Sequence, residues 1–556
     1  MNSNSEVLAN AVQNLDGGRI LAAEQLFRQV LQADPDQLEA LHRLGMLLTQ
    51  TGRYEEAVEM ILDAISLSPE TPLLHSHLGT ALLKQDRFDE AVACFQHALI
   101  LNPEDVEAQI ELGTAFEKLD QLDDAVMSYR RGVLLTPSDP VVYFKLGIAL
   151  QKQGHLNDAA ACFQQALALK PDYVAAHISM GIAFQKQNRL DYAITCYQNA
   201  LTLNPDSAEA RYNLGKAWLQ LGELASGWPD FESRIKVKRL SEFRLPKWDG
   251  SRLTGRRILL YAEQGLGDTI QFIRYAQLVK NSGGHVIVAC QPKLLALLKG
   301  CQGIDVLVPL PKNSAEGLPA FDFYLHLLSV PNVFGTTLES IPNDVPYLRA
   351  DQRLVEQWSS EIGSGDELKV GIAWQGNRQS PNDRDRSIHL TEFEPLGLVQ
   401  GTKFFNLQKG DGSEQVKVMQ GRLKITDFSD RMDSTTGALV DTAAIMMNLD
   451  LVITSDMAVA HLAGALGVPV WVALKHSPSW RWLLSRDDCP WYPTMRLFRQ
   501  EIAGDWGGVF RRMTAELRRF KLPDGSTERA LKCQINELLS SHATANSSPA
   551  AETRAT

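Results

Sequence analysis

The first 240 residues of this 556-residue chain repeat one pattern every 34 residues. A glycine, a proline, an alanine and a large apolar residue each recur with this period, and four registers sharing one period do not arise by chance. The glycines are Gly45, Gly79, Gly113, Gly147, Gly181 and Gly215, and the large residues are Phe27, Ile61, Phe95, Tyr129, Phe163, Tyr197 and Phe231. The pattern predicts two helices per unit, which approach closely at the small residues, pack around the large one and end before the proline.

These residues resemble the tetratricopeptide repeat (TPR), which has the same period. The resemblance covers residues 1–240 as about seven units, the first and last of them degenerate. It implies an α-solenoid of TPR helix pairs, a superhelix whose concave face suits a protein or peptide partner.

The fifth position of the first helix changes from polar to apolar and aromatic along successive units. The residues at this position are His42, Ser76, Ile110, Phe144, Ile178 and Tyr212. Such a change favours a peptide-binding surface toward the later units. Aromatic residues on repeat helices more often serve packing, however, so recognition and packing remain alternatives.

From Arg256 onward, short apolar strands alternate with helices. Strands are expected at 258–262, 285–290, 306–309 and 323–326 in a first lobe (256–350), and at 369–374, 403–407, 451–454 and 468–473 in a second lobe (351–520) that begins with a linker, 351–367. This alternation predicts two doubly wound, Rossmann-like lobes whose parallel sheets bind ligands at the carboxyl ends of the strands. Residues 540–556 are small and polar and are expected to form a disordered tail.

The segment EQGLGD, residues 263–268, joins the first of these strands to a helix. It has neither the GxGxxG pattern nor a P-loop lysine, which disfavours a phosphate-binding loop. Gly265 and Gly267 are instead expected to permit a sharp turn that presents Asp268 in a cleft between the lobes. The alternative is that Asp268 is an ordinary helix N-cap.

The segment GIAWQGNRQSPNDRDRSIHL, residues 371–390, places Trp374, Gly376 and Arg386 after a buried strand of the second lobe. Guanidinium groups at the carboxyl end of a strand suit a diphosphate, because their planar forks bind pairs of oxygen atoms. An equally good alternative is a solvated loop in which Asp383 and Asp385 pair with the arginines.

The segment LVITSDMAVAHLAGALGVPVWVAL, residues 451–474, reads as strand, helix and strand. Asp456 stands at the start of the helix, where backbone amides attract a phosphate, and His461 follows on the same helix. Asp456 has the alternative role of an N-cap, and His461 that of a satisfied core histidine.

Together these segments resemble the family 9 glycosyltransferases, the lipopolysaccharide heptosyltransferase type, and more narrowly bacterial proteins that fuse TPR arrays to that domain. The resemblance spans residues 256–520 and implies a GT-B fold and an inverting, metal-independent transfer of a sugar from a nucleotide-diphosphate sugar to a hydroxyl acceptor recruited by the TPR array. It implies Asp268 as general base and Arg386 as the cation that neutralises the donor diphosphate. Met457 and Ala458 depart from the family pattern, which removes one hydroxyl contact to the donor. The residues implied to bind the donor are Gly265, Gly267, Trp374, Gly376, Arg386, Gln408, Asp456, Met457, Ala458 and His461.

Charge and composition narrow the alternatives. The net charge of -11 disfavours a general grip on nucleic acid, and no segment reads as a membrane span or a secretory signal, so a cytoplasmic protein is expected. No acidic cluster predicts a metal, and no cofactor is expected beyond the nucleotide sugar as co-substrate. The competing hypothesis is a non-catalytic TPR scaffold with a degenerate glycosyltransferase-like binding domain.

Overall fold

The computed structural model describes residues 3–311, 317–378, 383 and 386–520. It divides into two compact units, Met1–Ser207 and Ala208–Thr556. The expected tail, 540–556, lies outside the described residues, as do Arg384 and Asp385.

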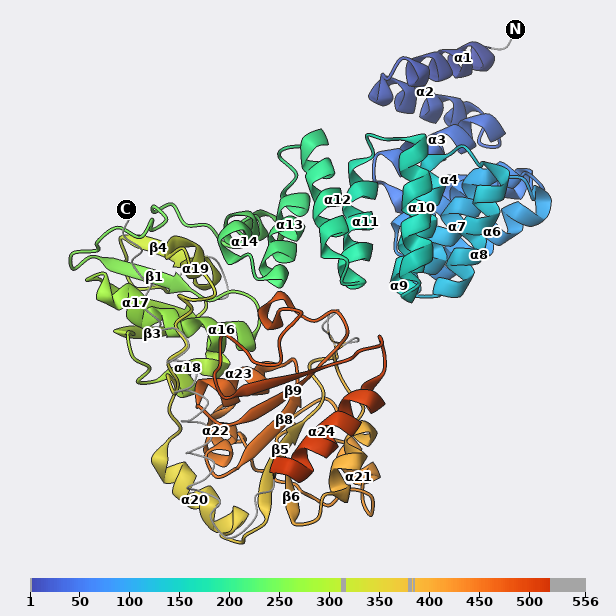
Figure 1. Cartoon of the computed structure of the whole chain (residues 1–556). Helices are drawn as coiled ribbons and strands as arrows, with labels where there is room; N and C mark the ends of the chain where they lie inside the picture. Colours follow the sequence, from blue (N-terminus) through green and yellow to red (C-terminus); the bar gives the residue numbers. More distant parts are fainter. Residues whose placement is uncertain (1–2, 312–316, 379–382, 384–385, 521–556) are drawn as a thin grey trace, which may run out of the picture. The chain divides into compact units, whose positions relative to one another are not determined.

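The first unit is built from consecutive helix pairs (Figure 1). Its helices are α1 (Ser3–Asp16), α2 (Ile20–Ala33), α3 (Leu38–Gln50), α4 (Tyr54–Leu67), α5 (Pro72–Lys84), α6 (Phe88–Leu101), α7 (Val106–Lys118), α8 (Leu122–Leu135), α9 (Pro140–Gln153), α10 (Leu156–Leu169), α11 (Val174–Lys186) and α12 (Leu190–Leu203). The second helix of each pair ends two residues before the periodic proline, as the sequence predicts.

The periodic glycines lie directly against the large residues of their own pairs. A Cβ atom on Gly79 would lie 2.8 Å from Phe95 Cε1, and one on Gly147 would lie 2.6 Å from Phe163 Cε1. Both phenylalanines are fully buried. The glycine therefore provides the space that the ring fills, which is why the two registers share one period.

A further helix pair belongs to the second unit rather than the first. It comprises α13 (Ala208–Leu221) and α14 (Leu224–Phe231), followed by the short helix α15 (Arg234–Val237). The array predicted over residues 1–240 thus extends across the division between the units.

The second unit contains two parallel sheets. The first has the order β3-β2-β1-β4, and the second has the order β10-β9-β8-β5-β6-β7. Their strands are β1 (Arg257–Tyr261), β2 (His285–Cys290), β3 (Val306–Pro309), β4 (Phe323–His326), β5 (Leu368–Ala373), β6 (Thr402–Asn406), β7 (Ile425–Thr426), β8 (Leu451–Ser455), β9 (Val470–Leu474) and β10 (Met495–Arg499). All eight predicted strands are present within one or two residues of their expected bounds.

The sequence pattern did not predict strands β7 and β10, and it did not predict the helix within the linker. Strand β7 has only two residues, and β10 carries two arginines, so neither has the apolar pattern of a buried strand. The expected linker, 351–367, contains an amphipathic helix, α20 (Gln352–Ile362), which buries Trp358.

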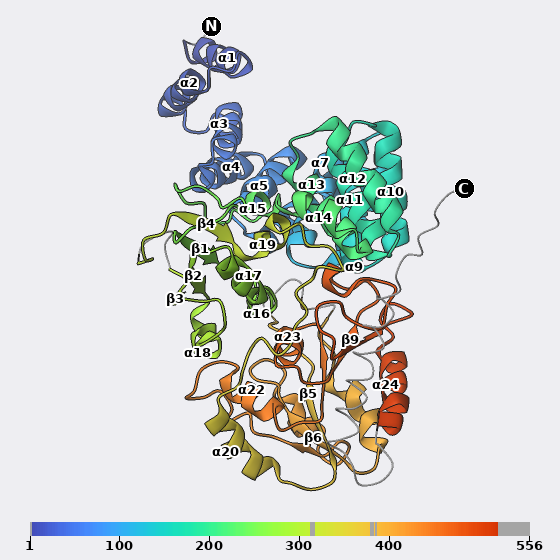
Figure 2. The same ribbon diagram turned by 60° about the vertical axis from the view of Figure 1, so that its left-hand side comes forward.

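Helices cover both faces of the second sheet. Helix α22 (Val440–Met446) shares a core with Val452 of β8, whereas α24 (Trp506–Phe520) shares another core with Ile453, the next residue along that strand. Successive strand residues point to opposite faces, so the two helices lie on opposite sides of the sheet (Figures 1 and 2). This is the double covering that near-continuous apolar strands predict.

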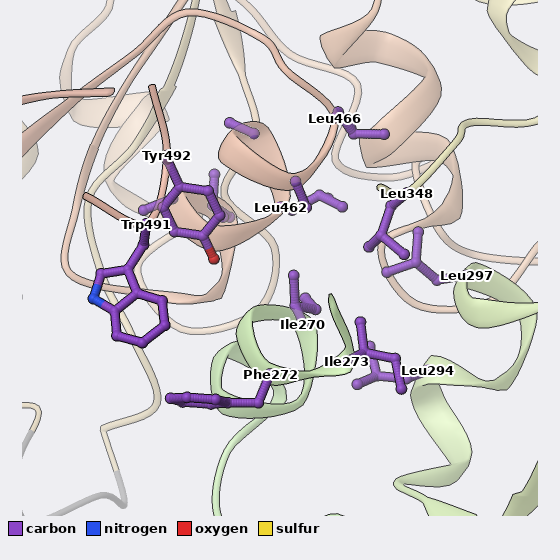
Figure 3. Close-up of a cluster of buried hydrophobic side chains, with 14 of the residues drawn as sticks. Ile270, Phe272, Ile273, Leu294, Leu297, Leu348, Leu462, Leu466, Trp491 and Tyr492 are labelled. Atoms are coloured by element: carbon purple, nitrogen blue, oxygen red, sulfur yellow. The ribbon is translucent and has the colours of Figure 1, made fainter. Parts of the chain in front are cut away.

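The two sheets are joined by helix α16 (Leu266–Phe272), which follows β1, and helix α23 (Ala458–Ala465), which follows β8. Figure 3 shows Ile270 and Ile273 facing Leu462 and Leu466 across this contact. Buried Arg274 adds polar bonds, donating to the carbonyl of Trp491 and, at 2.9 Å, to the Tyr347 hydroxyl. The carboxyl ends of β1 and β8 are thereby brought to one place.

Within the described residues, no helix is both long enough and apolar enough to cross a membrane.

Candidate active site

The turn after β1 holds Asp268 by a hydrogen bond to its own loop. Gly265 is the N-cap of α16, and Asp268, three residues later, accepts the Gly265 backbone N–H through Oδ2 at 2.8 Å. Asp268 is therefore not the N-cap residue of the alternative hypothesis, but it caps the helix from within the first turn by accepting the N–H group of the N-cap. Its side chain keeps 18% of its surface exposed.

The glycines of this turn act differently from the prediction. Neither Gly265 nor Gly267 has a positive φ; Gln264 takes the left-handed conformation, with φ 69°. Gly267 is required by close approach instead, because a Cβ there would lie 2.8 Å from His461 Cδ2 and 3.4 Å from Ala458 Cα. The turn of the first lobe thus touches the first turn of α23.

The other carboxylate oxygen of Asp268 pairs with Arg481, which the sequence reading did not single out. Arg481 lies in the 3-10 helix η5 (Trp480–Trp482), and one of its terminal nitrogens donates to Asp268 Oδ1. Its Nε donates to Gln271 Oε1 at 2.8 Å, and its guanidinium lies 4.4 Å from the centre of the Trp480 ring. The only signal in the sequence is an arginine between two tryptophans, Trp480 and Trp482.

His461 is a buried, neutral group beside this pair. It is 5% exposed, its Nδ1 lies 3.0 Å from the Tyr492 hydroxyl, and its ring stacks on Trp482 at 5.2 Å. Burial lowers the pKa of His461 well below its ordinary value, and the charges of Arg481, Arg274 and Arg386 act in the same direction. At neutral pH the ring is therefore a hydrogen-bonding group without charge.

Helix α23 begins at Ala458, two residues later than the sequence placed it, so the predicted alternative of Asp456 as its N-cap is wrong. Met457 is its N-cap, with an extended backbone and a side chain that is 9% exposed, and Ala458 is its first residue. Asp456 is half-buried and precedes the cap. The first turn of α23 lies next to Gly267 of the first lobe, through the Cα atom of Ala458 and the ring of His461.

Arg386 keeps part of its surface open but already has a carboxylate partner. Its Nε lies 3.3 Å from Asp383 Oδ1, and 31% of its side chain is exposed. Asp383 also accepts the Ser387 hydroxyl at 2.7 Å. The predicted alternative of aspartate–arginine pairing is thus present, and it fixes Arg386 at the carboxyl end of β5.

Three other predicted donor-binding residues build the loop from within. Trp374 is fully buried in the core, and a Cβ on Gly376 would lie 2.1 Å from Asp383 Oδ1. Gln408 Oε1 accepts the backbone N–H groups of Trp374 and Gln375, and its Nε2 donates to the carbonyls of Gln375 and Asp411. The Gln408 side-chain amide has two hydrogens to donate and two sites to accept, and all four are used. It could therefore contact a nucleotide sugar only by breaking one of these hydrogen bonds.

A buried ion pair supports the turn from the helical side. Arg234 of α15 is fully buried and donates to Glu263 Oε1 at 2.8 Å. Arg234 also donates to Ser329 Oγ at 2.8 Å, while burial raises the pKa of the Glu263 carboxyl and the Arg234 charge opposes that rise. Charges buried in this way are retained only when they are paired, so the pair fixes the residue that starts the Gly–Asp turn.

Two of the aromatic residues predicted to line the groove, Phe144 and Tyr212, contact other aromatic rings of the helices. Phe144 lies 5.9 Å from Phe163 and 5.0 Å from Tyr173, and Tyr212 lies 5.6 Å from Phe231, measured between ring centres. These contacts are the ones that packing predicts, and peptide recognition by the half-buried faces of Phe144 and Tyr212 stays a prediction. Elsewhere, His42 Nε2 lies 2.6 Å from His77 Nδ1, so two polar residues of the array bond to each other.

In the part of the chain that the structure describes, no group of three or more histidine, cysteine, aspartate or glutamate side chains is arranged to hold a metal ion. The groups gathered where the two sheets meet are the Asp268 carboxylate, the Arg481 guanidinium, the neutral His461 imidazole and the first turn of α23. The Arg386 guanidinium lies close enough for its charge to act on His461. Such a set can accept a proton and bind an anion.

Comparison with known proteins identifies the repeats. Residues 14–78 and 77–140 match families described as tetratricopeptide repeat, and residues 152–188 and 183–222 match a family described as TPR repeat. The chain is 28% identical over 322 residues to protein FlbA of Caulobacter vibrioides, a match that covers 54% of this chain and 54% of FlbA. It therefore spans about half the length of that relative.

Solved structures with similar helices include YrrB, titled a TPR protein with an unusual peptide-binding site, and Pseudomonas aeruginosa PilF. YrrB is 22% identical with a TM-score of 0.30, covering 33% of this chain and 95% of its own; PilF is 18% identical with a TM-score of 0.34, covering 37% and 95%. The predicted repeats are confirmed by the family matches: the N-terminal region of the chain, to about residue 220, consists of TPR repeats.

Proposed function

We propose that the second unit is an inverting glycosyltransferase domain of the GT-B type, similar to the family 9 enzymes. The observation that carries the proposal is the contact between Gly267 and the first turn of α23, at Ala458 and His461. It joins the carboxyl ends of two parallel sheets, the place where doubly wound folds bind their ligands. The resemblance of the sequence segments suggests the reaction class, and the side chains at the contact would supply the chemistry.

The donor would bind on the side of the second sheet. Arg386 and the amides at the start of α23 would hold the diphosphate of a nucleotide sugar, with Asp456 nearby. Their positive potential would stabilise the charge that grows on the diphosphate as its bond to the sugar breaks. Trp374, Gly376 and Gln408 would serve by fixing this loop.

Asp268 would act on the acceptor. As the acceptor oxygen forms its bond to the anomeric carbon, the bond from that carbon to the diphosphate breaks, and the hydroxyl proton passes to Asp268. Attack from the face opposite the leaving group inverts the configuration. The TPR repeats would recruit a protein or peptide, either as the acceptor itself or as a partner that brings it.

The second candidate is a scaffold whose transferase-like unit binds a nucleotide without catalysis. It is favoured by the contacts of Asp268, since each carboxylate oxygen already accepts a hydrogen bond from the protein. Met457, which offers no hydroxyl at the start of α23, favours it as well.

The deciding experiment is turnover by the purified full-length protein against a panel of nucleotide-diphosphate sugars, with Asp268→Asn as the test variant. The proposal predicts turnover of at least one donor and a loss of about 100- to 10,000-fold in the variant. Asp366→Asn is the matched control, because Asp366 is an exposed aspartate of the same unit. Nucleotide binding without turnover, in both the native protein and the variant, would favour the scaffold instead.

A further inference from the structure

Arg481 makes two contacts with one helix, and both matter for the position of Asp268. It bonds to Asp268 and to Gln271, which lie about one turn apart on α16. The Arg481 side chain is 11% exposed. The Gln271 side-chain nitrogen is buried with no partner among the described residues, so the hydrogen bond that Gln271 Oε1 accepts from Arg481 is the polar contact that fixes that side chain.

The segment that carries Arg481 is itself held by the helix pair α13–α14. Gln220, 2% exposed on α13, donates to the Pro478 carbonyl at 3.2 Å. Trp480 meets Trp228 and Phe231 of α14 edge to face, with ring centres 5.4 and 5.7 Å apart. Trp228 in turn donates to the Thr336 carbonyl at 2.8 Å, which ties the pair to the first lobe.

We infer that Arg481 is a positioning residue for Asp268, and that the helix pair α13–α14, which continues the repeat spacing, is a structural part of the proposed active site. The inference rests on the proposed function. The inference goes beyond the proposed function because it connects the last repeat-like helices to the proposed base through a series of contacts. Gln220 contacts the chain just before η5, Trp228 contacts η5, and Arg481 of η5 contacts Asp268.

The geometry leaves Asp268 able to act while it is held. An ionised carboxylate offers about four acceptor directions, and the Gly265 amide and Arg481 use two of them. An acceptor hydroxyl can therefore bond to a remaining direction without displacing either group. Fixing a carboxylate from two sides lowers its conformational freedom, so less entropy is lost on reaching the reactive geometry and the reaction is faster.

The test measures kcat and the donor KM of the full-length protein with the donor found in the panel. Arg481→Ala is expected to lower kcat by about 100-fold with donor KM unchanged, since Arg481 touches the base rather than the donor. Arg481→Lys, which keeps the charge but cannot bridge Asp268 and Gln271, is expected to recover part of the loss. Added guanidinium ion is expected to restore part of the activity of Arg481→Ala.

The matched control is Arg486→Ala, which removes a half-buried arginine of the same stretch of chain that pairs with Asp488 and not with Asp268. Its kcat is expected to stay native. Far-UV circular dichroism checks that each variant is folded, and Arg481→Lys carries the test if Arg481→Ala is not.

The path through α13 is tested by a double-mutant cycle. Gln220→Ala is expected to lower kcat by about threefold to tenfold, and the same change made in Arg481→Ala is expected to lower it no further, because both act through one contact chain. Independent, multiplying losses would overturn the role of α13. Native kcat in Arg481→Ala would overturn the inference while leaving the proposed function intact, whereas absence of turnover in the native protein would overturn both.

Discussion

In both units a glycine lets two helices approach closely. The two units differ in how far apart the contacting residues lie in the sequence. In the first unit Gly79 faces Phe95 of its own helix pair, and the same contact returns in the following pairs. In the second unit Gly267 faces His461, and Asp268 meets Arg481 across 213 positions. A periodic contact can be read from one chain, whereas a single distant contact leaves no periodic trace.

The stability of the two units can be measured separately, because they give different spectroscopic signals on unfolding. All ten tryptophans of the chain lie at or beyond Trp218, in the second unit. Tryptophan emission therefore reports unfolding of the second unit alone. Far-UV circular dichroism reports the helices of both units, and most of the long helices lie in the first.

The largest expected effect is that of Phe163→Ala in the first unit. Phe163 is fully buried, and its removal leaves a cavity beside Gly147, so the free energy of unfolding should fall by about 3–5 kcal/mol. The loss should appear in the circular-dichroism transition during urea unfolding.

Leu134→Ala is the control for Phe163→Ala, because Leu134 is 75% exposed on a helix of the same unit. It should change the free energy of unfolding by less than about 0.5 kcal/mol. The tryptophan transition should stay in place in both variants. A shift of that transition in Phe163→Ala would show that the two units do not unfold separately, and the comparison would then fail.

The fold was predictable to the extent that it depends on local patterns. The period located the helix pairs, and apolar runs located eight strands because most strand residues of the two sheets are buried. Strand β7 is too short and β10 too polar for that rule. Helix α20 was read as linker because its polar face is as evident as its apolar one.

The candidate site was predictable only in part. Asp268, Arg386 and His461 each follow a strand, and the resemblance of their segments to a known family is what singled them out as predictions. Arg481 and Arg234 reach the site from segments that carry no motif, and their roles come from tertiary contacts alone. Gln408 and Trp374 lie near the site, but their side chains are used inside the fold.

A matched pair of glycines gives the next largest effect. Gly79→Ala and Gly267→Ala both add a Cβ inside a helix, 2.8 Å from the nearest ring atom of a buried aromatic or imidazole side chain. Overpacking of this kind costs about 1–3 kcal/mol, and the higher helix propensity of alanine offsets about 1 kcal/mol in each case. The two variants should therefore lose similar stability, Gly79→Ala by circular dichroism and Gly267→Ala by tryptophan emission.

Their effects on turnover should differ. Gly267→Ala must push α23 away from the turn, since His461 is held by Tyr492 and by stacking on Trp482, and turnover should fall. Gly79→Ala should keep native turnover, because its contact lies within one helix pair. Equal losses of turnover in the two variants would contradict the separation of local and distant contacts.

The smallest expected effect is a difference in acid sensitivity at His326, where β4 ends beside β1. His326 is 1% exposed, and its Nε2 has no hydrogen-bond partner among the described residues. Burial lowers its pKa to about 4, helped by the charges of Arg234 and Lys247, while a bond involving Ser241 and the charge of Glu242 oppose the shift. In the unfolded chain the same ring titrates near pH 6.5.

The sign of the effect follows from these two values. Below pH 6.5 the unfolded chain binds a proton that the folded chain does not, so the stability contributed by a neutral His326 is complete above pH 6.5 and is lost as the pH falls toward 4. Between pH 7 and pH 6, the native protein should lose about 0.5–1 kcal/mol more than His326→Gln, as measured by urea unfolding followed through tryptophan emission. The control is His42→Gln, because His42 also has a pKa lowered to about 4, mainly by burial. His42 lies in the first unit, which has no tryptophan, so this variant should leave the acid slope of the tryptophan transition unchanged. If His326→Gln kept the native slope, the ring would be reached by a proton in the folded state, and the closed packing at the end of β4 would be wrong.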